Sequence, residues 1–181
     1  MDNKKLEFKL LKGKEISDEL FNEFYNYLIE SMRKDEYRSY EKQKSLLEKE
    51  HYQILFCFFE NRIIGVMALW RLSSFEFIEH FAVKKECRGK GIGSKMIEFI
   101  QNKFNNKVIL EVELPYNETN RKRIYFYEQH GFSYNDFEYF QTPLNQGDEP
   151  LPLRIMSYPD PINRKEFEKA QNLLKESAYK H

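Results

Sequence analysis

The sequence has few of the residues that mark several common classes of protein. Its 181 residues include two cysteines and four histidines, with no C-x-x-C motif and no metal-ligand spacing. This scarcity argues against a disulfide framework or a structural zinc site and favours a reducing compartment. No apolar run approaches the roughly 18 residues that span a bilayer, and the N-terminus lacks the apolar stretch of a signal peptide. We therefore expect a cytoplasmic protein with no metal and no membrane partner.

Net charge is also lacking, because 29 Lys and Arg residues balance 29 Asp and Glu residues. A general nucleic-acid binder normally carries a basic excess, so no nucleic-acid partner is expected. With 41% hydrophobic and 32% charged residues, the composition is that of an ordinary globular chain. A length of 181 residues favours a single domain.

Glycine and proline are scarce and unevenly placed. Three of the seven glycines fall within residues 89–93, and all six prolines follow residue 114. Between these breaks, alternating or apolar runs predict strands and apolar residues at helical spacing predict helices. The predicted strands are 6–11, 52–59, 63–72, 75–83, 108–114, 137–141 and 151–158. The predicted helices are 17–29, 37–49, 94–105, 120–130 and 163–175.

This order of elements predicts one α+β domain with a mixed sheet over residues 1–158. Residues 159–181 are expected to form a helical extension that either packs on the domain or trails it. The aromatic-rich late strands and this last helix are compatible with a homodimer contact and equally with a place in the core.

The segment from Val83 to Ser94 carries the clearest chemical signal. A predicted strand ends at Val83, and residues 88–93, RGKGIG, lead into a predicted helix. Glycines allow successive N–H groups to converge on one anion, and a helix start adds the positive end of its dipole. Within residues 84–95 five basic side chains and one acidic side chain leave a net charge of +4. The pattern favours a pyrophosphate site, with a tight turn bearing solvated lysines as the alternative.

Two motifs resemble those of the GNAT N-acetyltransferases. Residues 88–93 resemble the acetyl-CoA-binding R/Q-x-x-G-x-G/A loop of that family. Asn120 followed by residues 126–132, FYEQHGF, resembles its N-x-x-A-x-x-(F/L)-Y-E-x-x-G-F motif. Both motifs occur in the family's order with a strand between them, and the resemblance covers about residues 52–140. It implies the GNAT acyl-CoA N-acyltransferase fold, in which helices flank a mixed, mostly antiparallel central sheet with splayed strands.

The resemblance also implies acetyl-CoA as a co-substrate. The glycine-rich loop would hold its pyrophosphate, the preceding strand would pair with its pantetheine arm, and the motif asparagine would contact it. The implied cofactor-binding residues are Phe81, Ala82, Val83, Arg88, Gly89, Lys90, Gly91, Ile92, Gly93, Ser94, Asn120 and Tyr127. The sequence departs from the family at Arg123, where the family has alanine. The basic run 121–123 is either a solvated helix start or an added contact to a cofactor phosphate.

Acetyl transfer to an amine needs a base, a group that stabilises the oxyanion and an acid for the leaving thiolate. Tyr127 matches the family's tyrosine that protonates the sulfur. A backbone N–H group within 81–83 would stabilise the oxyanion. The resemblance thus implies catalytic roles both for a side chain and for the backbone of the splayed strand.

Glu79 and Glu111 are the two candidates for the base. Strict alternation in the strand places Glu79 on the face of Phe77 and Phe81 and places His80 on the opposite face, where we expect a structural role. Glu111 resembles the strand glutamate that accepts a proton in the ribosomal-protein acetylating branch. Either carboxylate can equally be a solvated or salt-bridged residue of the sheet.

The sequence therefore predicts an acetyl-CoA-dependent N-acetyltransferase that transfers acetyl directly to a primary amine of a small molecule or peptide in a ternary complex. Acidic residues within 111–118 and 136–138 would favour a cationic amine. The alternatives are an acyltransferase that uses another acyl-CoA and a non-catalytic module that binds CoA or another protein.

Overall fold

A seven-stranded sheet forms the centre of the computed structural model, which describes residues 5–180. The sheet order is β1-β2-β3-β4-β5-β7-β6, and all neighbours are antiparallel except β4 and β5. The strands are β1 (Glu7–Leu11), β2 (Tyr52–Phe59), β3 (Arg62–Arg71), β4 (Phe75–Val83), β5 (Lys107–Glu113), β6 (Ser133–Gln141) and β7 (Leu151–Tyr158). The predicted mixed, mostly antiparallel sheet is confirmed.

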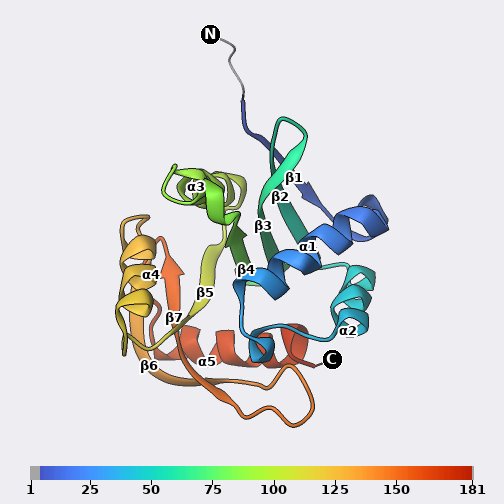
Figure 1. Ribbon diagram of the computed structural model, residues 1–181. Coiled ribbons are helices and arrows are strands. Elements are labelled where there is room, and N and C mark those ends of the chain that lie inside the picture. Colours follow the sequence, from blue (N-terminus) through green and yellow to red (C-terminus); the bar gives the residue numbers. More distant parts are fainter. Residues whose placement is uncertain (1–4, 181) are drawn as a thin grey trace.

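Helices cover both faces of the sheet (Figure 1). On one face lie α1 (Asp18–Ser31), α2 (Tyr40–Ser45) and α5 (Arg164–Leu173), whose apolar side chains form a first core cluster with the sheet. On the other face α3 (Ile92–Lys103) and α4 (Glu118–Glu128) enclose a second cluster. Among the helices of residues 5–180, none has both the length and the apolar character needed to cross a membrane.

Most predicted elements are confirmed, but three differ in extent. The predicted helix 37–49 shortens to α2 and one 3-10 turn, Leu46–Glu48. β6 begins at Ser133, four residues before the predicted strand 137–141. After α5 the chain continues as a π-helical turn, Leu174–Ala178, whose two end residues are buried in the first cluster. The C-terminal segment thus contributes directly to the core.

A bulge in β4 changes the face on which its side chains lie. Ile78 and His80 pair with consecutive residues of β3, so Glu79 between them has no partner there. Phe77, before the bulge, packs in the first cluster, whereas Phe81, after it, packs against the second. The predicted common face for Phe77, Glu79 and Phe81 is wrong, because one extra residue reverses the alternation.

Arg38 and Glu79 form a buried ion pair next to this bulge. Arg38 Nη1 lies 2.8 Å from Glu79 Oε1, and the two side chains are 1% and 2% exposed. Glu79 Oε2 also accepts a hydrogen bond from Trp70 Nε1 at 3.2 Å. Arg38 donates in addition to the carbonyl oxygen of Ala178. The pair therefore joins four parts of the chain: the segment before α2, β3, β4 and the C-terminal turn.

Replacing Arg38 by methionine should destabilise the fold by about 3–5 kcal/mol at pH 7, because Glu79 would be left charged and buried without a partner. In the wild type burial raises the pKa of Glu79, but Arg38, together with His80 and Trp70, outweighs this effect, so that the pKa of Glu79 lies below its ordinary value. The pair's contribution is therefore present above the ordinary carboxylate pKa and is lost as pH falls through the folded-state pKa.

In Arg38→Met the pKa of Glu79 should rise, so the penalty should shrink between pH 7 and pH 5 as Glu79 becomes protonated. Urea unfolding at both pH values measures this difference. The double variant Arg38→Met/Glu79→Gln serves as a control and should be more stable than Arg38→Met alone at pH 7. An equal loss at both pH values would contradict the buried ion pair.

Candidate active site

The candidate site forms where β4 and β5 separate. The two strands pair from Phe75 with Lys107 as far as Ile78 with Leu110, and beyond these residues they are no longer paired. The splayed strands predicted from the resemblance are thereby confirmed. Two cavities, of about 530 Å³ and about 130 Å³, lie along this gap, and we call them the larger and the smaller cavity.

The larger cavity lies between the end of β4, the glycine-rich loop and α4. Its lining consists of Phe81, Val83, Cys87, Arg88, Gly89, Gly91, Ile92, Gly93, Ser94, Arg123, Phe126 and Tyr127. Nine of these belong to the predicted cofactor-binding set. Ala82, Lys90 and Asn120 of that set do not line the cavity. The end of β4, the glycine-rich loop with the start of α3, and α4 are thus brought together much as the sequence indicates.

Backbone geometry makes the glycine-rich loop suitable for an anion. Gly89 and Gly91 have φ values of +72° and +75°, a region that favours glycine, and Gly91 is the N-cap of α3. The first N–H groups of α3 have no partner within the helix, and its first turn carries no acidic side chain. Arg88 Nε donates to the carbonyl oxygen of Val83 at 2.9 Å, which fixes the loop to the end of β4. The free N–H groups and the helix dipole together favour a phosphate here.

The smaller cavity lies beneath the segment that joins α1 to α2. Phe81, Arg123 and Tyr127 line both cavities, so the cavities meet at these three side chains. The remaining lining residues are Ser31, Met32, Glu36, Ile78, Glu79, His80, Leu110, Glu111, Glu113, Gln141, Leu151 and Leu153. Within residues 5–180 no three His, Cys, Asp or Glu side chains gather in the manner of metal ligands.

Tyr127 stands at the junction of the two cavities. It projects from α4 and is 7% exposed, and no hydrogen bond from another residue of the described chain engages its hydroxyl group. Burial raises the pKa of Tyr127 to about 12, although the charge of Arg123 partly opposes this rise. The hydroxyl group is therefore protonated at neutral pH and available to a ligand.

Glu111 enters the smaller cavity from β5 and is held there by neutral donors. Its Oε1 accepts a hydrogen bond from the hydroxyl group of Tyr139. Its Oε2 accepts one from Gln141 Nε2 at 2.7 Å and one from the hydroxyl group of Tyr179 at 2.6 Å. Burial raises the pKa of Glu111 to about 7, even though these three hydrogen bonds lower it. A carboxyl group with this pKa can accept a proton near neutral pH.

His80 lies beside Glu79 and not across the sheet from it. His80 Nδ1 is 3.5 Å from Glu79 Oε2, and its Nε2 is hydrogen-bonded to the carbonyl oxygen of Glu36 at 2.9 Å. The predicted opposite faces are wrong because of the bulge at Glu79. Burial lowers the pKa of His80, so its ring is neutral at pH 7. This ring connects β4 to the segment that covers the smaller cavity.

Of Asn120 and the basic run 121–123, only Arg123 lines the two cavities. Asn120 Nδ2 donates to the carbonyl oxygen of Leu114 at 2.9 Å, which ties α4 to the loop after β5. Arg121 donates to a backbone carbonyl and Lys122 pairs with Glu118, both at the surface. Arg123 reaches the junction of the cavities and lies 3.4 Å from Glu113. Of the basic run, therefore, Arg123 belongs to the site.

The acidic side of the smaller cavity differs from the predicted one. Glu111 and Glu113 line it as expected, whereas Glu118 and Asp136 form ion pairs elsewhere on the surface. Glu36, which the sequence analysis did not select, contributes instead. Arg33 lies in the same segment between α1 and α2 as Glu36, and its ion pair with Glu113 ties that segment to β5.

Sequence reasoning also missed Arg38, Gln141 and Tyr179. Tyr139 and Gln141 are two residues apart on a predicted strand, so their common face was available as a signal. Arg38 and Tyr179 lie far along the chain from their partners, Glu79 and Glu111. No periodic pattern in the sequence indicates these two contacts.

A family comparison covers the glycine-rich loop, both candidate carboxylates and Tyr127. Residues 50–134 match the family described as Acetyltransferase (GNAT) domain. YjbC of Bacillus subtilis, a protein named as an acetyltransferase, is 33% identical to this chain over 72 residues. That match covers 38% of this chain and 36% of YjbC, so it spans about a third of the length of this relative.

Solved structures resemble nearly the whole chain. A protein of Bacteroides thetaiotaomicron assigned to the GNAT family is 26% identical, with a TM-score of 0.86, and the match covers 96% of this chain and 98% of that one. Arabidopsis thaliana Naa50, in complex with the bisubstrate analogue CoA-Ac-MVNAL, is 19% identical, with a TM-score of 0.59 and coverage of 83% and 97%. A GNAT acetyltransferase of Elizabethkingia anophelis with acetyl-CoA bound is 15% identical, with a TM-score of 0.56 and coverage of 86% and 98%.

The last two structures show a shared fold, whereas the family match includes the glycine-rich loop and Tyr127. The order of the strands, the gap between β4 and β5 and the position of the loop agree with that assignment. Residues 50–134 therefore match the GNAT acetyltransferase domain, and nearly the whole chain has the fold of GNAT proteins.

Proposed function

We propose that this protein is an acetyl-CoA-dependent N-acetyltransferase that transfers the acetyl group directly to a primary amine of a small molecule or a peptide. The observation that carries the proposal is the junction of the two cavities at Tyr127, with Glu111 in the smaller one. Two substrates bound on either side of this junction would be held in contact, as direct transfer in a ternary complex requires.

The chemistry of the larger cavity fits acetyl-CoA. The glycine-rich loop and the start of α3 offer N–H groups to a pyrophosphate. Beyond Ile78 the edge of β4 that faces β5 is unpaired, and an amide-bearing pantetheine arm can add to it as a strand would. The volume of about 530 Å³ lies within the roughly 300–1,000 Å³ of ligand pockets. The acetyl-CoA bound to the Elizabethkingia anophelis relative supports this choice.

Tyr127 would act as the general acid. When bound, acetyl-CoA supplies an acetyl group activated as a thioester. Because burial raises the pKa of Tyr127 to about 12, its phenol keeps a proton to donate to the leaving sulfur. Arg123 lines the same junction, and its positive charge would stabilise the phenolate that remains.

Glu111 is the better of the two candidates for the general base. Its pKa of about 7 suits a group that accepts a proton at neutral pH, either directly from the amine or through a water molecule. Glu79 also lines the cavity, but the Arg38 guanidinium holds the pKa of Glu79 below its ordinary value. A carboxylate bound by Arg38 and Trp70 accepts a further proton less readily.

The smaller cavity favours a cationic amine as the acceptor. Glu36, Glu111 and Glu113 line it. Arg33 pairs with both Glu36 and Glu113, and Arg123 pairs with Glu113, so among these three described carboxylates Glu111 is the one held by neutral donors. A volume of about 130 Å³ admits the amine-bearing end of a molecule and leaves the rest outside. This geometry suits both acceptor classes, and the peptide-containing analogue bound to Naa50 supports the peptide class.

Thiol release from acetyl-CoA in the presence of a panel of amines tests the proposed activity. We expect release with cationic small amines or peptide amines, and a product heavier by one acetyl group in mass spectrometry. Binding of CoA in calorimetry without turnover of any acceptor would contradict the proposal and favour a non-catalytic module. Faster turnover with another acyl-CoA would contradict the choice of donor.

The substitution Tyr127→Phe should lower kcat by about 10²-fold, because it removes the acid but keeps the ring in place. The KM for acetyl-CoA should change little. Tyr125→Phe is a matched control, since Tyr125 lies on the same helix but is 60% exposed, and its kcat should equal that of the wild type. An unchanged kcat for Tyr127→Phe across pH would remove Tyr127 from this role.

The kcat/KM of the wild type should rise with pH through about 7, since Glu111 accepts a proton only after it has lost its own. Glu111→Gln should abolish this rise and lower kcat by about 10²–10⁴-fold. Glu79→Gln provides the comparison and should retain the rise. If Glu79→Gln abolishes it and Glu111→Gln retains it, the assignment of the base is reversed.

A further inference from the structure

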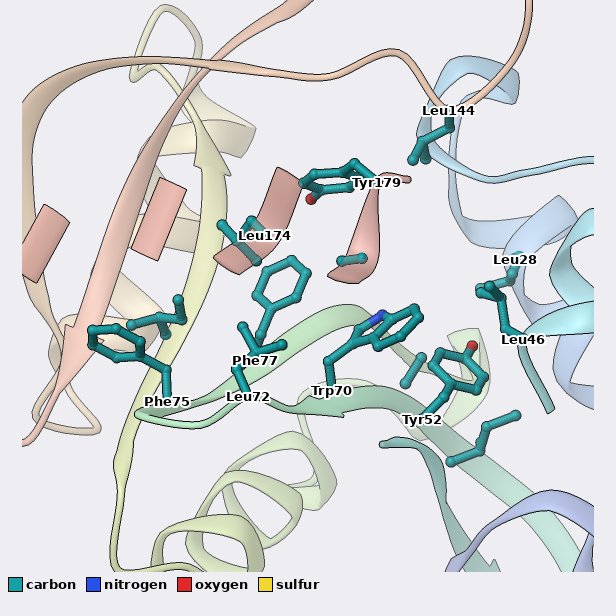
Figure 2. Packing of buried hydrophobic residues seen from close by; sticks show 14 of the residues in the cluster. Leu28, Leu46, Tyr52, Trp70, Leu72, Phe75, Phe77, Leu144, Leu174 and Tyr179 are labelled. Atoms are coloured by element: carbon teal, nitrogen blue, oxygen red, sulfur yellow. The ribbon is translucent and has the colours of Figure 1, made fainter. Parts of the chain in front are cut away.

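The end of the chain contributes a side chain to the candidate site. Leu174 and Ala178 of the π-helical turn are 1% and 0% exposed, and Tyr179 directly after them is 8% exposed. Figure 2 shows Tyr179 close to Phe77 of β4 and to Leu174, and its ring centroid lies 6.3 Å from that of Phe77. The aromatic ring is therefore part of the first core cluster, whereas the hydroxyl group points out of it toward β5 and hydrogen-bonds Glu111.

The hydroxyl group of Tyr179 completes the set of donors around Glu111. It donates to Glu111 Oε2 at 2.6 Å and accepts a hydrogen bond from Gln141 Nε2 at 3.1 Å. Gln141 donates to the same carboxylate oxygen, so the three groups form a closed arrangement. Tyr139 engages the other oxygen. Burial raises the pKa values of both tyrosines well above the ordinary value, which keeps them as donors.

We propose that Tyr179 is a positioning residue for Glu111, and that the C-terminal turn thereby completes the acceptor side of the active site. This inference rests on the proposed function, in which Glu111 is the general base. Tyr179 itself does not line either cavity, so it would act through the carboxylate and not on a substrate. Its bond to Oε2 limits rotation of the carboxyl group and orients it in the smaller cavity.

A second anchor holds this turn in place. Arg38 donates to the carbonyl oxygen of Ala178 while its guanidinium pairs with Glu79. Ala178 at the end of the turn and Tyr179 directly after it are therefore connected to two of the carboxylates that line the smaller cavity, Ala178 to Glu79 through Arg38 and Tyr179 to Glu111 directly. Figure 1 shows the C-terminal end next to the segment between α1 and α2, as this connection requires.

The groups around Glu111 define how its protonation should respond to a change at Tyr179. Burial raises the pKa of Glu111, the hydrogen bonds from Tyr139, Tyr179 and Gln141 lower it, and the negative charge of Glu79 raises it. The other titratable or charged side chains that line the smaller cavity are Glu36, His80, Glu113, Arg123 and Tyr127. Loss of one donor to the charged form should therefore raise the pKa of Glu111.

The test compares the wild type with Tyr179→Phe, which keeps the buried ring and removes only the hydroxyl group. We expect the rise of kcat/KM with pH to move upward by about one pH unit, because a hydrogen bond to a charged group is of about this size. At pH 6 the variant should be about tenfold slower, and above pH 9 it should regain most of the wild-type rate. A merely structural role would lower the rate without moving the midpoint.

Tyr27→Phe is the matched control, since Tyr27 donates to the carbonyl oxygen of Ile63 at 2.7 Å and lines neither cavity of the site. It loses a partly buried tyrosine hydroxyl bond that does not reach Glu111, and the midpoint of its pH profile should equal that of the wild type. An unshifted midpoint in Tyr179→Phe, or an equal shift in Tyr27→Phe, would overturn the inference.

A measurement without substrate separates this inference from the proposed function. With ¹³C-labelled glutamate, the carboxyl resonance that disappears in Glu111→Gln reports the titration of Glu111. Its midpoint should lie near pH 7 in the wild type and higher in Tyr179→Phe. If it does not move, the positioning role is overturned even where the enzyme acetylates amines. If it moves but no amine is acetylated, the proposed function fails, and with it the role of Tyr179 in catalysis.

Discussion

The separation of β4 from β5 is the constraint on which the rest of the structure depends. β4 and β5 pair in parallel as far as Ile78 and Leu110, and beyond these residues the facing edges of the two strands are unpaired. The bulge at Glu79 coincides with this point and reverses the faces of the residues that follow. As a result Phe81 lines both cavities, and the end of β4 leads directly into the glycine-rich loop and α3. One break in strand pairing thus places the larger cavity, beside the glycine-rich loop, and the smaller cavity next to each other.

Two carboxylates lie in the gap, and their surroundings give them opposite properties. Glu79 is paired with a guanidinium group, whereas Glu111 is bound only by neutral donors. The pKa of Glu79 is consequently lowered, and that of Glu111 is raised to about 7 by burial. Neighbouring groups with divergent pKa values are typical of acid–base sites. Ala178 and Tyr179 contact these two groups, Ala178 through Arg38 and Tyr179 through its bond to Glu111. The C-terminal segment is therefore part of the first core cluster and also of the hydrogen bonds of the site.

The sequence predicted the parts of the fold and site that depend on local patterns. The β2–β3 hairpin, the loop between β4 and α3 and the position of Tyr127 follow from periodicity, glycine spacing and a family motif. The alternation of side chains in the sequence does not indicate where a single-residue bulge occurs, so the face of Glu79 was predicted wrongly. The bond between Tyr179 and Glu111 spans 68 residues, and a contact of this kind follows only from how α5 packs on the sheet.

A crystal structure of the protein with CoA bound would show whether the two cavities hold the two substrates as proposed. We expect the pyrophosphate to lie on the N–H groups of Gly91–Ser94 and the thiol to reach the junction of the two cavities. There the sulfur should lie within hydrogen-bonding distance of the Tyr127 hydroxyl group, with Glu111 facing it across the smaller cavity. A CoA molecule whose thiol lies away from this junction, or that binds outside the gap between β4 and β5, would contradict the proposed active site.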